Sequence, residues 1–524
     1  MISAGKSVSS NGVVSEHVFQ SKDRAIFLIL TLLGLGAIVF FLSSWFRLPA
    51  WGTHPFSMVV LFAILSALLV NHLARWWVLR DMVRPLPVPA RSGWKVAVVT
   101  TFVPRLEPLE MLERTLSALV AMDYPHDTWV LDEEDDDRVR QLCESTGAIH
   151  FSRKRFPHYQ TEVGTYRKAS KHGNYNAWLH EIGFNRYEIL AAFDPDHVPE
   201  PNFLSRVLGF FESARVGYVQ APQVYANQQA SFIARGAAEE TYEFFSSVQM
   251  ACYAKGFPLI IGCHNTHRLS ALRECGGFAS HDADDLLLTL LYQSRGWHGV
   301  YVPEILARGL APVDWPTYLN QQRRWTRSVL DIKLRIGPIV ARNLSPAAMF
   351  LNVLHGLNYV HRSIVLPVAM ILVAMMLLSG DIPVVATSDT MIGGGLTILV
   401  LEIWEWFRQR FYLGGKFERG FHWRAWLVQF AKWPYQIAAF ADVIFKRQFP
   451  YVTTPKSERV SHPVFVLWPH LITLIVTASA WLIGRSLHGT PPVALQLCGG
   501  AIMVVTLGLM ITEWIERSGE TGEP

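Results

Sequence analysis

The middle of this 524-residue chain carries four groups of polar side chains in a fixed order. They are Asp132, then Asp194 with Asp196, then Asp284 with Asp285, and finally Gln321 with Arg324 and Trp325. Two carboxylates one residue apart favour a hard divalent cation, and Mg²⁺ typically bridges such carboxylates to substrate phosphates. An Asp-x-Asp pair also occurs in solvated turns. Because this pair follows the apolar run 189–193, we predict a metal site for Mg²⁺ or Mn²⁺ that binds a nucleoside diphosphate.

Asp284 and Asp285 stand at the start of an apolar helix that is predicted to end near Gly296. A carboxylate in this position can simply cap the helix. Transfer of a group to a hydroxyl instead needs a general base that removes the hydroxyl proton. The preferred candidate for that base is Asp285, and Asp282 remains an alternative.

Gln321, Arg324 and Trp325 are spaced so that a helix places an amide, a guanidinium and an indole on one face. An indole can stack on a sugar ring, and a guanidinium can hold a diphosphate through forked hydrogen bonds. The same stretch could also be a basic helix on a membrane surface, with Arg323, Arg324 and Arg327 facing lipid phosphates.

Asp132 opens the acidic string 132–137. Most of this string is typical of a solvated loop or a first helical turn, where negative charge suits the helix dipole. Only Asp132, and to a lesser extent Glu133, would stand at the end of a strand. The string lacks the glycine and the spacing of an EF-hand, which argues against calcium.

Short apolar strands alternate with helical segments between about residues 93 and 335, and leucines 109, 112, 116 and 119 make one helix face. This alternation predicts an α/β domain with a mostly parallel sheet, whose ligands gather at the carboxyl ends of the strands. The predicted strands are 95–102, 128–131, 188–193, 217–220, 259–261 and 299–302.

Half of the chain is apolar and only 17% is charged, which indicates a membrane protein. Each membrane span needs about 20 apolar residues. Six stretches qualify: 26–46, 56–73, 363–379, 390–407, 464–483 and 493–514. The first could also be read as a signal peptide, but its apolar run is long and a second span follows at once.

Basic residues flank the first two spans on the sides of the N-terminus and the central domain, whereas the turn between them carries only Arg47. The positive-inside rule therefore predicts a cytosolic central domain. The net charge of +4 does not call for a nucleic-acid partner, because these juxtamembrane residues account for it. No pair among the five cysteines has the spacing of metal ligands, so we predict reduced thiols.

The predicted organisation follows from these segments. It comprises a cytosolic tail (1–25), two spans (26–92), the α/β domain (93–335), an interfacial region (336–362), two spans (363–407), interfacial helices with a loop (408–462), two spans (463–515) and a C-terminal tail (516–524).

Taken together, the motifs resemble those of processive family 2 glycosyltransferases of the cellulose synthase type, over roughly residues 27–514. Residues 193–199 resemble the metal-binding Asp-x-Asp segment of that family, and Gln321, Arg324 and Trp325 match its Gln-x-x-Arg-Trp signature. The resemblance implies a GT-A (Rossmann-like) fold and these further roles: Asp132 at the uridine, Lys171 at the diphosphate, Asp284 and Asp285 in place of Glu-Asp at the catalytic base, and a gating loop containing Phe449, Val452, Thr453 and Lys456.

Two segments depart from the pattern of the family. Thr101 and Glu107 only loosely resemble its opening nucleotide-binding segment. His264 and Asn265 stand where cellulose synthases carry a Cys-Gly-Ser type sequence near the acceptor, so the linkage of the product is left open. We expect no C-terminal PilZ domain after the last predicted span, so the sequence does not predict direct control by cyclic di-GMP.

The function implied by the resemblance is polymerisation of UDP-glucose into a β-linked glycan that is extruded across the plasma (bacterial inner) membrane. The catalytic domain would then be cytosolic, and an accessory subunit is a plausible partner. The sequence leaves three alternatives open: a nonprocessive transferase acting on a lipid, a chitin- or hyaluronan-type synthase using another UDP-sugar, and a transporter or binding protein. Aromatics in the later spans, namely Trp404, Trp406 and Trp468, could stack on the glycan or form an interfacial belt.

Overall fold

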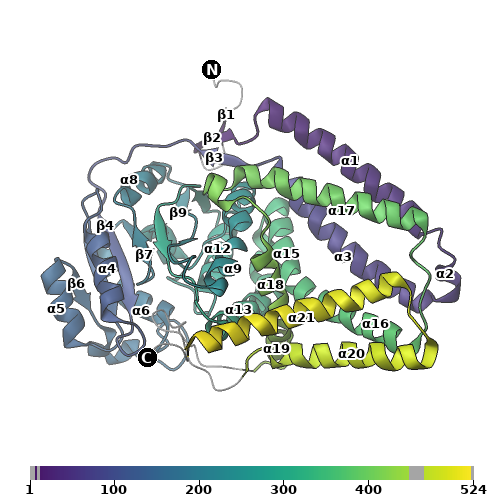
Figure 1. Ribbon diagram of the computed structural model, residues 1–524. Helices are drawn as coiled ribbons and strands as arrows, with labels where there is room; N and C mark the ends of the chain where they lie inside the picture. Colours follow the sequence, from purple (N-terminus) through teal and green to yellow (C-terminus); the bar gives the residue numbers. More distant parts are fainter. Residues whose placement is uncertain (1–5, 9–11, 448–464, 521–524) are drawn as a thin grey trace.

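The protein combines a sheet domain with a bundle of long helices, which lie at opposite ends of the molecule (Figure 1). The computed structural model describes residues 6–8, 12–447 and 465–520. The predicted α/β domain with a helical membrane region is confirmed by this architecture.

The sheet domain is built on a seven-stranded mixed sheet. Its strands, in spatial order, are β12 (His298–Tyr301), β9 (Val216–Gln220), β11 (Asn265–Arg268), β7 (Ile189–Phe193), β4 (Val96–Phe102), β5 (Asp127–Asp132) and β6 (Ile149–Phe151). Only β11 runs antiparallel to its neighbours. The carboxyl ends of β4, β5 and β7 therefore meet at one edge, where Phe102 pairs with Asp132 and Thr100 pairs with Phe193.

Helices cover both faces of this sheet. They include α4 (Leu109–Val120), α5 (Asp137–Thr146), α6 (Lys171–Trp178), α8 (Phe203–Val207), α10 (Gln249–Ala254), α11 (Leu269–Glu274) and α12 (Asp284–Ser294). Leu112, Leu116 and Leu119 are fully buried on one face of α4, as their spacing predicts. The α5 helix begins where the Asp136 side chain accepts a hydrogen bond from the Arg138 N–H, and it ends at Gly147, whose φ of 82° suits glycine.

Five of the six predicted strands are present, but the prediction of a strand at 259–261 is wrong. Side chains take the place of a strand ladder there. Gln249 bonds both the N–H and the carbonyl of Leu259, and the N–H groups of Ile260 and Ile261 donate to Thr289 and Gln220. These partners satisfy the backbone N–H and C=O groups of this buried apolar segment without sheet pairing. The polar strand β11 was not predicted, because its sequence Asn-Thr-His-Arg has no apolar run.

Two small sheets complete the strands. One joins β10 (Val224–Tyr225), β13 (Ala307–Gly309) and β8 (Val198–Pro199), and the other joins β1 (Lys6–Val8), β2 (Val14–His17) and β3 (Val83–Pro85). The first of these sheets holds the segment that follows Asp196. Gly309 lies so close to His197 that an added Cβ would come within 2.2 Å of the imidazole Nε2, so only glycine fits there.

Six helices among the described residues are long and apolar enough to cross a membrane, as predicted. They are Ser21–Trp45 (α1), Pro55–Leu79 (α3), Pro346–Ser379 (α15 to α16), Ser388–Phe411 (α17 and the turn after it), Trp468–His488 (α20) and Val493–Arg517 (within α21). The third begins at Pro346, inside the stretch 336–362 that was predicted to be an interfacial region. Large apolar side chains such as Leu32, which is 62% exposed, point outward from these helices as lipid contact requires.

Shorter helices connect the sheet domain with the membrane helices. The α9 helix (Phe232–Glu239) packs against α18 (Trp423–Ala431), and α13 (Trp315–Asp331) packs against α19 (Trp433–Ile444). Lys432 pairs with Glu240 at 2.7 Å across the first contact region, and Arg323 pairs with Asp442 at 2.7 Å across the second. The first ion pair ties the end of α9, and the second ties α13, to the helices of the bundle.

Trp404 packs inside the bundle. Its ring stacks on Trp76 with centroids 4.4 Å apart, its indole N–H donates to the Leu30 carbonyl, and Gly34 lies directly against the ring. Trp404→Ala should therefore destabilise the protein by about 3–5 kcal/mol, as truncation of a buried tryptophan usually does. Thermal unfolding in detergent measures the effect. Trp406→Ala is the matched control, because Trp406 is 76% exposed, and an equal loss in both variants would contradict this packing role.

Candidate active site

A single cavity of about 1690 Å³ runs from the carboxyl edge of the sheet into the helical bundle. The predicted site residues that line it are Thr101, Glu107, Lys171, Asp194, Asp196, Asp284, Asp285, Gln321, Arg324 and Trp325. Residues of the membrane helices, such as Asn71, Tyr359 and Trp406, line the same cavity. Side chains that are remote in the sequence therefore share one space.

Asp194 lies directly after β7, at the carboxyl edge of the sheet. Its carboxylate forms an ion pair with the ammonium group of Lys171, the first residue of α6, and this ammonium group also donates to the Gly262 carbonyl. Burial alone would lower the pKa of Lys171, but Asp194, Tyr175 and Asp284 outweigh that effect and hold the pKa well above its ordinary value. A permanent positive charge thus stands beside the first carboxylate of the pair.

Asp196 is more deeply placed than Asp194, and its side chain is fully buried. One carboxylate oxygen lies 3.2 Å from His197 Nδ1, and the other accepts a hydrogen bond of 3.0 Å from the Leu310 N–H. Asp194, Asp196 and His197 each have a ligand atom within 4.8 Å of the others. This oxygen-rich group suits a divalent cation of the Mg²⁺ or Mn²⁺ kind.

Asp284 and Asp285 form the first turn of α12 and line the cavity opposite Lys171. The Asp285 carboxylate accepts a hydrogen bond of 2.7 Å from the Leu286 N–H. Burial raises the pKa of both carboxyl groups, and the negative charges of Asp285 and Asp194 raise that of Asp284 further. A carboxylate with a raised pKa in a cavity is a suitable general base.

Asp282, the alternative base, also lines the cavity but is held by two guanidinium groups. It lies 2.8 Å from Arg167 and 2.9 Å from Arg327. Burial would raise its pKa, but these two cations reverse the effect and the pKa is lowered. The geometry therefore favours Asp285 over Asp282.

Gln321, Arg324 and Trp325 lie along α13, which begins where Asp314 caps the Thr317 N–H and Pro316 occupies the first turn. All three line the cavity, and Trp325 is 37% exposed. Arg323 and Arg327 pair with Asp442 and Asp282. Two of the three basic residues that could have faced lipid phosphates are thus bound to carboxylates of the protein itself, and the third, Arg324, lines the cavity.

Residues 189–382, which include all of these acidic pairs and the α13 triplet, match the model of the family described as glycosyl transferase family group 2. The chain contains a family 2 glycosyltransferase domain. This finding confirms the resemblance seen in the motifs.

Curated relatives of this glycosyltransferase are similar at modest identity. Cellulose synthase 2 of Novacetimonas hansenii is 26% identical over 272 residues, which cover 50% of this chain and 16% of that protein. A probable glucomannan 4-beta-mannosyltransferase 4 of Oryza sativa subsp. japonica is 24% identical over 259 residues, which cover 48% of this chain and 47% of that protein. The match thus spans about half of the rice relative and a smaller share of the bacterial one.

A solved structure shares the fold of this glycosyltransferase. The mannosyltransferase PcManGT from Pyrobaculum calidifontis, solved in complex with GDP-Man and Mn²⁺, aligns with a TM-score of 0.50 at 16% sequence identity. The alignment covers 75% of this chain and 99% of that protein. It supports the GT-A assignment of the sheet domain.

Asp132 does not line the cavity of the glycosyltransferase domain, although it ends β5 as predicted. It is fully buried, and its carboxylate accepts hydrogen bonds from the N–H groups of Glu134 and Asp136 and lies 3.0 Å from His150. Glu133 lines the cavity instead and is held by Arg153. Asp132 therefore shapes the acidic loop in this structure, and its predicted contact with uridine stays a prediction.

His264 and Asn265 are also absent from the cavity wall. Both are buried: one ring nitrogen of His264 bonds the Pro222 carbonyl, and the Asn265 amide donates to the Ile261 carbonyl. This placement does not support their predicted role at the acceptor. Gly262 and Cys263, immediately before them, line the cavity. Phe449, Val452, Thr453 and Lys456 of the predicted gating loop lie outside the described residues.

The wall within the helical bundle includes residues that the motifs did not indicate. Aromatic rings contribute much of it: Tyr359, Trp406, Phe421, Trp423, Trp426 and Phe430. Of the three tryptophans proposed from the sequence, Trp406 lines the cavity and Trp404 and Trp468 do not. Charged residues on this wall are mostly paired, as Arg75 is with Glu243 and Glu405 is with Arg408. Short motifs carry no signal for such residues, because they come from helices that meet only in the fold.

Proposed function

We propose that this protein is a processive, inverting glycosyltransferase that builds a β-linked glycan and passes it through its own helical bundle. The observation that carries the proposal is the single cavity, which is lined by Asp194, Asp285 and Trp325 at one end and by membrane helices at the other. A nonprocessive transferase has no need for such a continuous path.

Asp194 and Asp196 are the residues that would hold a divalent cation, since carboxylate oxygens are the preferred ligands of Mg²⁺ and Mn²⁺. When bound, such a cation neutralises charge on the donor diphosphate. Lys171 stands beside Asp194, and Arg324 reaches the same cavity from α13. These two cations would stabilise the charge that develops on the leaving diphosphate.

Asp285 would remove the proton from the terminal hydroxyl of the acceptor. The hydroxyl oxygen then attacks the anomeric carbon of the donor, the bond between that carbon and the diphosphate oxygen breaks, and the nucleoside diphosphate leaves with the electron pair. Attack from the opposite face inverts an α-linked donor into a β-linked product. Trp325 would stack on the acceptor sugar, and Gln321 would hydrogen-bond it.

The raised pKa of the carboxyl pair leads to a testable pH dependence. The base works only when ionised, so transfer should fall as the pH is lowered through its pKa, at a pH above the ordinary aspartate value of about 3.9. Asp284→Asn removes the other carboxyl group of this coupled pair, so that Asp285 titrates alone and the acid limb of the pH profile moves. The profile of kcat against pH measures the shift. An unchanged limb in that variant would contradict electrostatic coupling between Asp284 and the base.

UDP-glucose is the donor we propose first, because the motifs resemble those of cellulose synthases. The rice relative is described as a mannosyltransferase and the Pyrobaculum protein was solved with GDP-Man, so GDP-mannose is the second candidate. We further propose that the protein lies in the plasma membrane with its catalytic domain in the cytosol, on the evidence of the basic residues that flank the first two spans.

The product distinguishes this proposal from transfer of one sugar to a lipid. Purified protein should be incubated with Mg²⁺ and, in turn, UDP-glucose, UDP-N-acetylglucosamine and GDP-mannose, followed by sizing and linkage analysis of the product. We expect a long β-linked glycan from one donor. A single sugar attached to lipid would overturn processivity, while no transfer from any donor would overturn the enzymatic proposal.

A further inference from the structure

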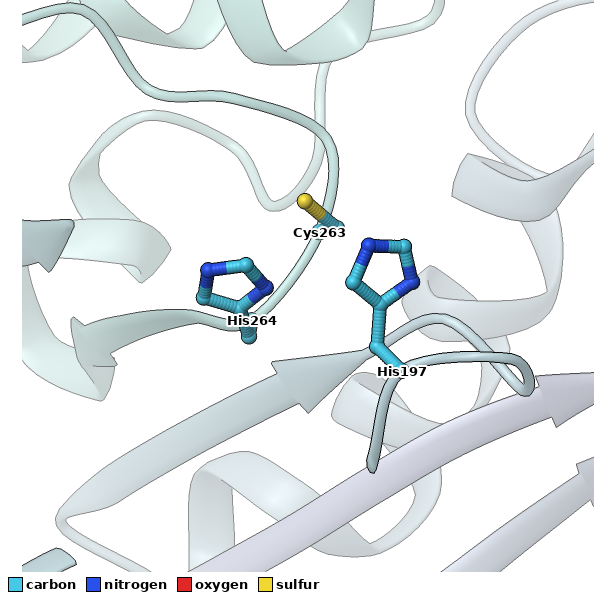
Figure 2. A group of neighbouring side chains, drawn as sticks. All are labelled: His197, Cys263 and His264. Carbon is cyan, nitrogen blue, oxygen red and sulfur yellow. The ribbon is translucent and has the colours of Figure 1, made fainter. Parts of the chain in front are cut away.

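We propose that His197, Cys263 and His264 form a second metal site, one that binds a thiophilic divalent cation of the Zn²⁺ class (Figure 2). This site adjoins the carboxylate pair Asp194 and Asp196, because His197 lies within 4.8 Å of both groups of ligand atoms. It rests on the geometry of the three side chains whatever sugar the protein transfers.

The three side chains come from two loops that meet behind the cavity wall. His197 follows the Asp194-Pro-Asp196 segment, whereas Cys263 and His264 precede β11. One ligand atom of each residue lies within 4.8 Å of the other two, and each residue is at most 1% exposed. Tetrahedral Zn²⁺ with sulfur and nitrogen ligands holds its ligand atoms about 3.3–3.8 Å apart. The three ligand atoms are therefore grouped closely enough for one such ion.

His264 provides the independent indication of a ligand. Its Nε2 lies 3.0 Å from the Pro222 carbonyl and must donate to it, which leaves Nδ1 unprotonated in the neutral ring. Nδ1 is fully buried and has no hydrogen-bond partner. Figure 2 shows a nitrogen of this ring turned toward the space beside His197 and Cys263. The residue also adopts a φ of +33°, a conformation that non-glycine residues rarely take. A buried acceptor without a donor is costly, and a cation would satisfy it.

His197 is oriented as metal-binding histidines commonly are. Its Nδ1 lies 3.2 Å from a carboxylate oxygen of Asp196, and its Nε2, which has only a long contact of 3.5 Å with the Gln223 amide, is the ligand atom offered to the cluster. A carboxylate that accepts the second N–H of a histidine fixes the ring and strengthens it as a ligand. The thiolate of Cys263 would offset part of the charge of a divalent cation in this buried site.

The ligand types distinguish this site from the carboxylate site that is proposed to bind the donor diphosphate. Thiolate and imidazole select Zn²⁺ over Mg²⁺, whereas carboxylate oxygens select Mg²⁺ or Mn²⁺. His197 and Cys263 both line the cavity, so an ion can enter from there. Once bound, the cation would tie the loop of Asp196 to the loop of Gly262, whose carbonyl accepts a hydrogen bond from Lys171. The site would thus stabilise the relative position of two walls of the cavity.

The test measures the metal content of the full-length protein, which is purified in detergent with a tag that contains no histidines. The protein is saturated with Zn²⁺ alone, washed with a weak chelator and measured by plasma emission. We expect one equivalent of zinc in the unmodified protein and a loss of at least 80% of it in Cys263→Ser. Substitution with Co²⁺ should give the near-ultraviolet absorption of a thiolate–cobalt bond. His264→Asn should weaken zinc retention about 10-fold or more, because loss of even an outer-shell partner typically lowers metal affinity about 10–100-fold.

Cys275→Ser is the matched control, because Cys275 is also buried in the sheet domain but belongs to no group of metal ligands found among the described residues. It should keep both the zinc and the cobalt absorption. Elution volume and thermal unfolding show whether Cys263→Ser is folded. If the unmodified protein retains no zinc and gives no thiolate–cobalt band, the proposal is overturned whatever the variants do. Retention of zinc by folded Cys263→Ser would overturn it as well. Neither result depends on glycan synthesis.

Discussion

Replacing Asp285 by Asn should reduce sugar transfer by about 10²–10⁴-fold, which is the usual contribution of a general base. The asparagine amide is nearly the same size as the carboxylate. Its oxygen can still accept the hydrogen bond from the Leu286 N–H at the start of α12. It cannot take a proton. Because Asp285 faces the donor cavity without being one of the proposed metal ligands, binding of the nucleoside diphosphate should change little. Turnover and nucleotide affinity measured on the same preparation separate the two effects.

Asp282→Asn is the matched control for that experiment. Asp282 lies three residues away in the same cavity, but its carboxylate is engaged by Arg167 and Arg327 and its pKa is lowered. Its replacement should lower the stability of the protein more than it lowers the rate of the chemical step. If Asp282→Asn loses transfer while Asp285→Asn retains it, the roles of the two residues must be exchanged. Retained transfer in both variants would show that neither is the base.

Removal of divalent cations should lower transfer by about 10³-fold, since such a cation supplies several kcal/mol to the transition state and each 1.4 kcal/mol is tenfold. Excess Mg²⁺ or Mn²⁺ should restore the activity after a chelator has been removed. Asp194→Asn should abolish this restoration, because the substitution takes away a carboxylate at the carboxyl edge of β7. Initial rates over a range of Mg²⁺ concentrations measure the effect.

Glu107→Gln serves as a comparison for the metal experiment. Glu107 lines the same cavity, but its carboxylate accepts a hydrogen bond of 2.9 Å from the Val103 N–H and does not belong to the metal-binding group. Its Mg²⁺ dependence should match that of the unmodified protein. Full turnover in the absence of any divalent cation would reassign Asp194 and Asp196 to another role.

Much of this arrangement could be predicted because strands carry a strong local signal. The apolar run of β7 places Asp194 at a strand end, and the spacing of Gln321, Arg324 and Trp325 places them on one helix face. Long apolar segments likewise predict the membrane helices. In each case the pattern of a single segment determines where its side chains point.

The surroundings of other residues could not be predicted, because they depend on contacts between segments. Asp132 stands at a strand end, yet the loop after it folds back and uses its carboxylate for two backbone N–H groups. His264 turns away from the cavity because its backbone has a positive φ, and no residue pattern predicts that conformation. Trp404 and Trp406 are two residues apart in one apolar segment. The packing of α17 on α1 and α3 buries Trp404 in the bundle and leaves Trp406 on the cavity wall, and the sequence pattern does not distinguish these two positions.

The central claim is that synthesis and export share one cavity, and a sealed proteoliposome tests it most directly. Donor and Mg²⁺ are supplied outside, to protein molecules whose catalytic domain faces outward, and a glycan-degrading enzyme is either enclosed in the lumen or added outside. We predict a long glycan that the enclosed enzyme shortens and that the external enzyme leaves largely intact. A long product that only the external enzyme degrades would contradict export through the bundle.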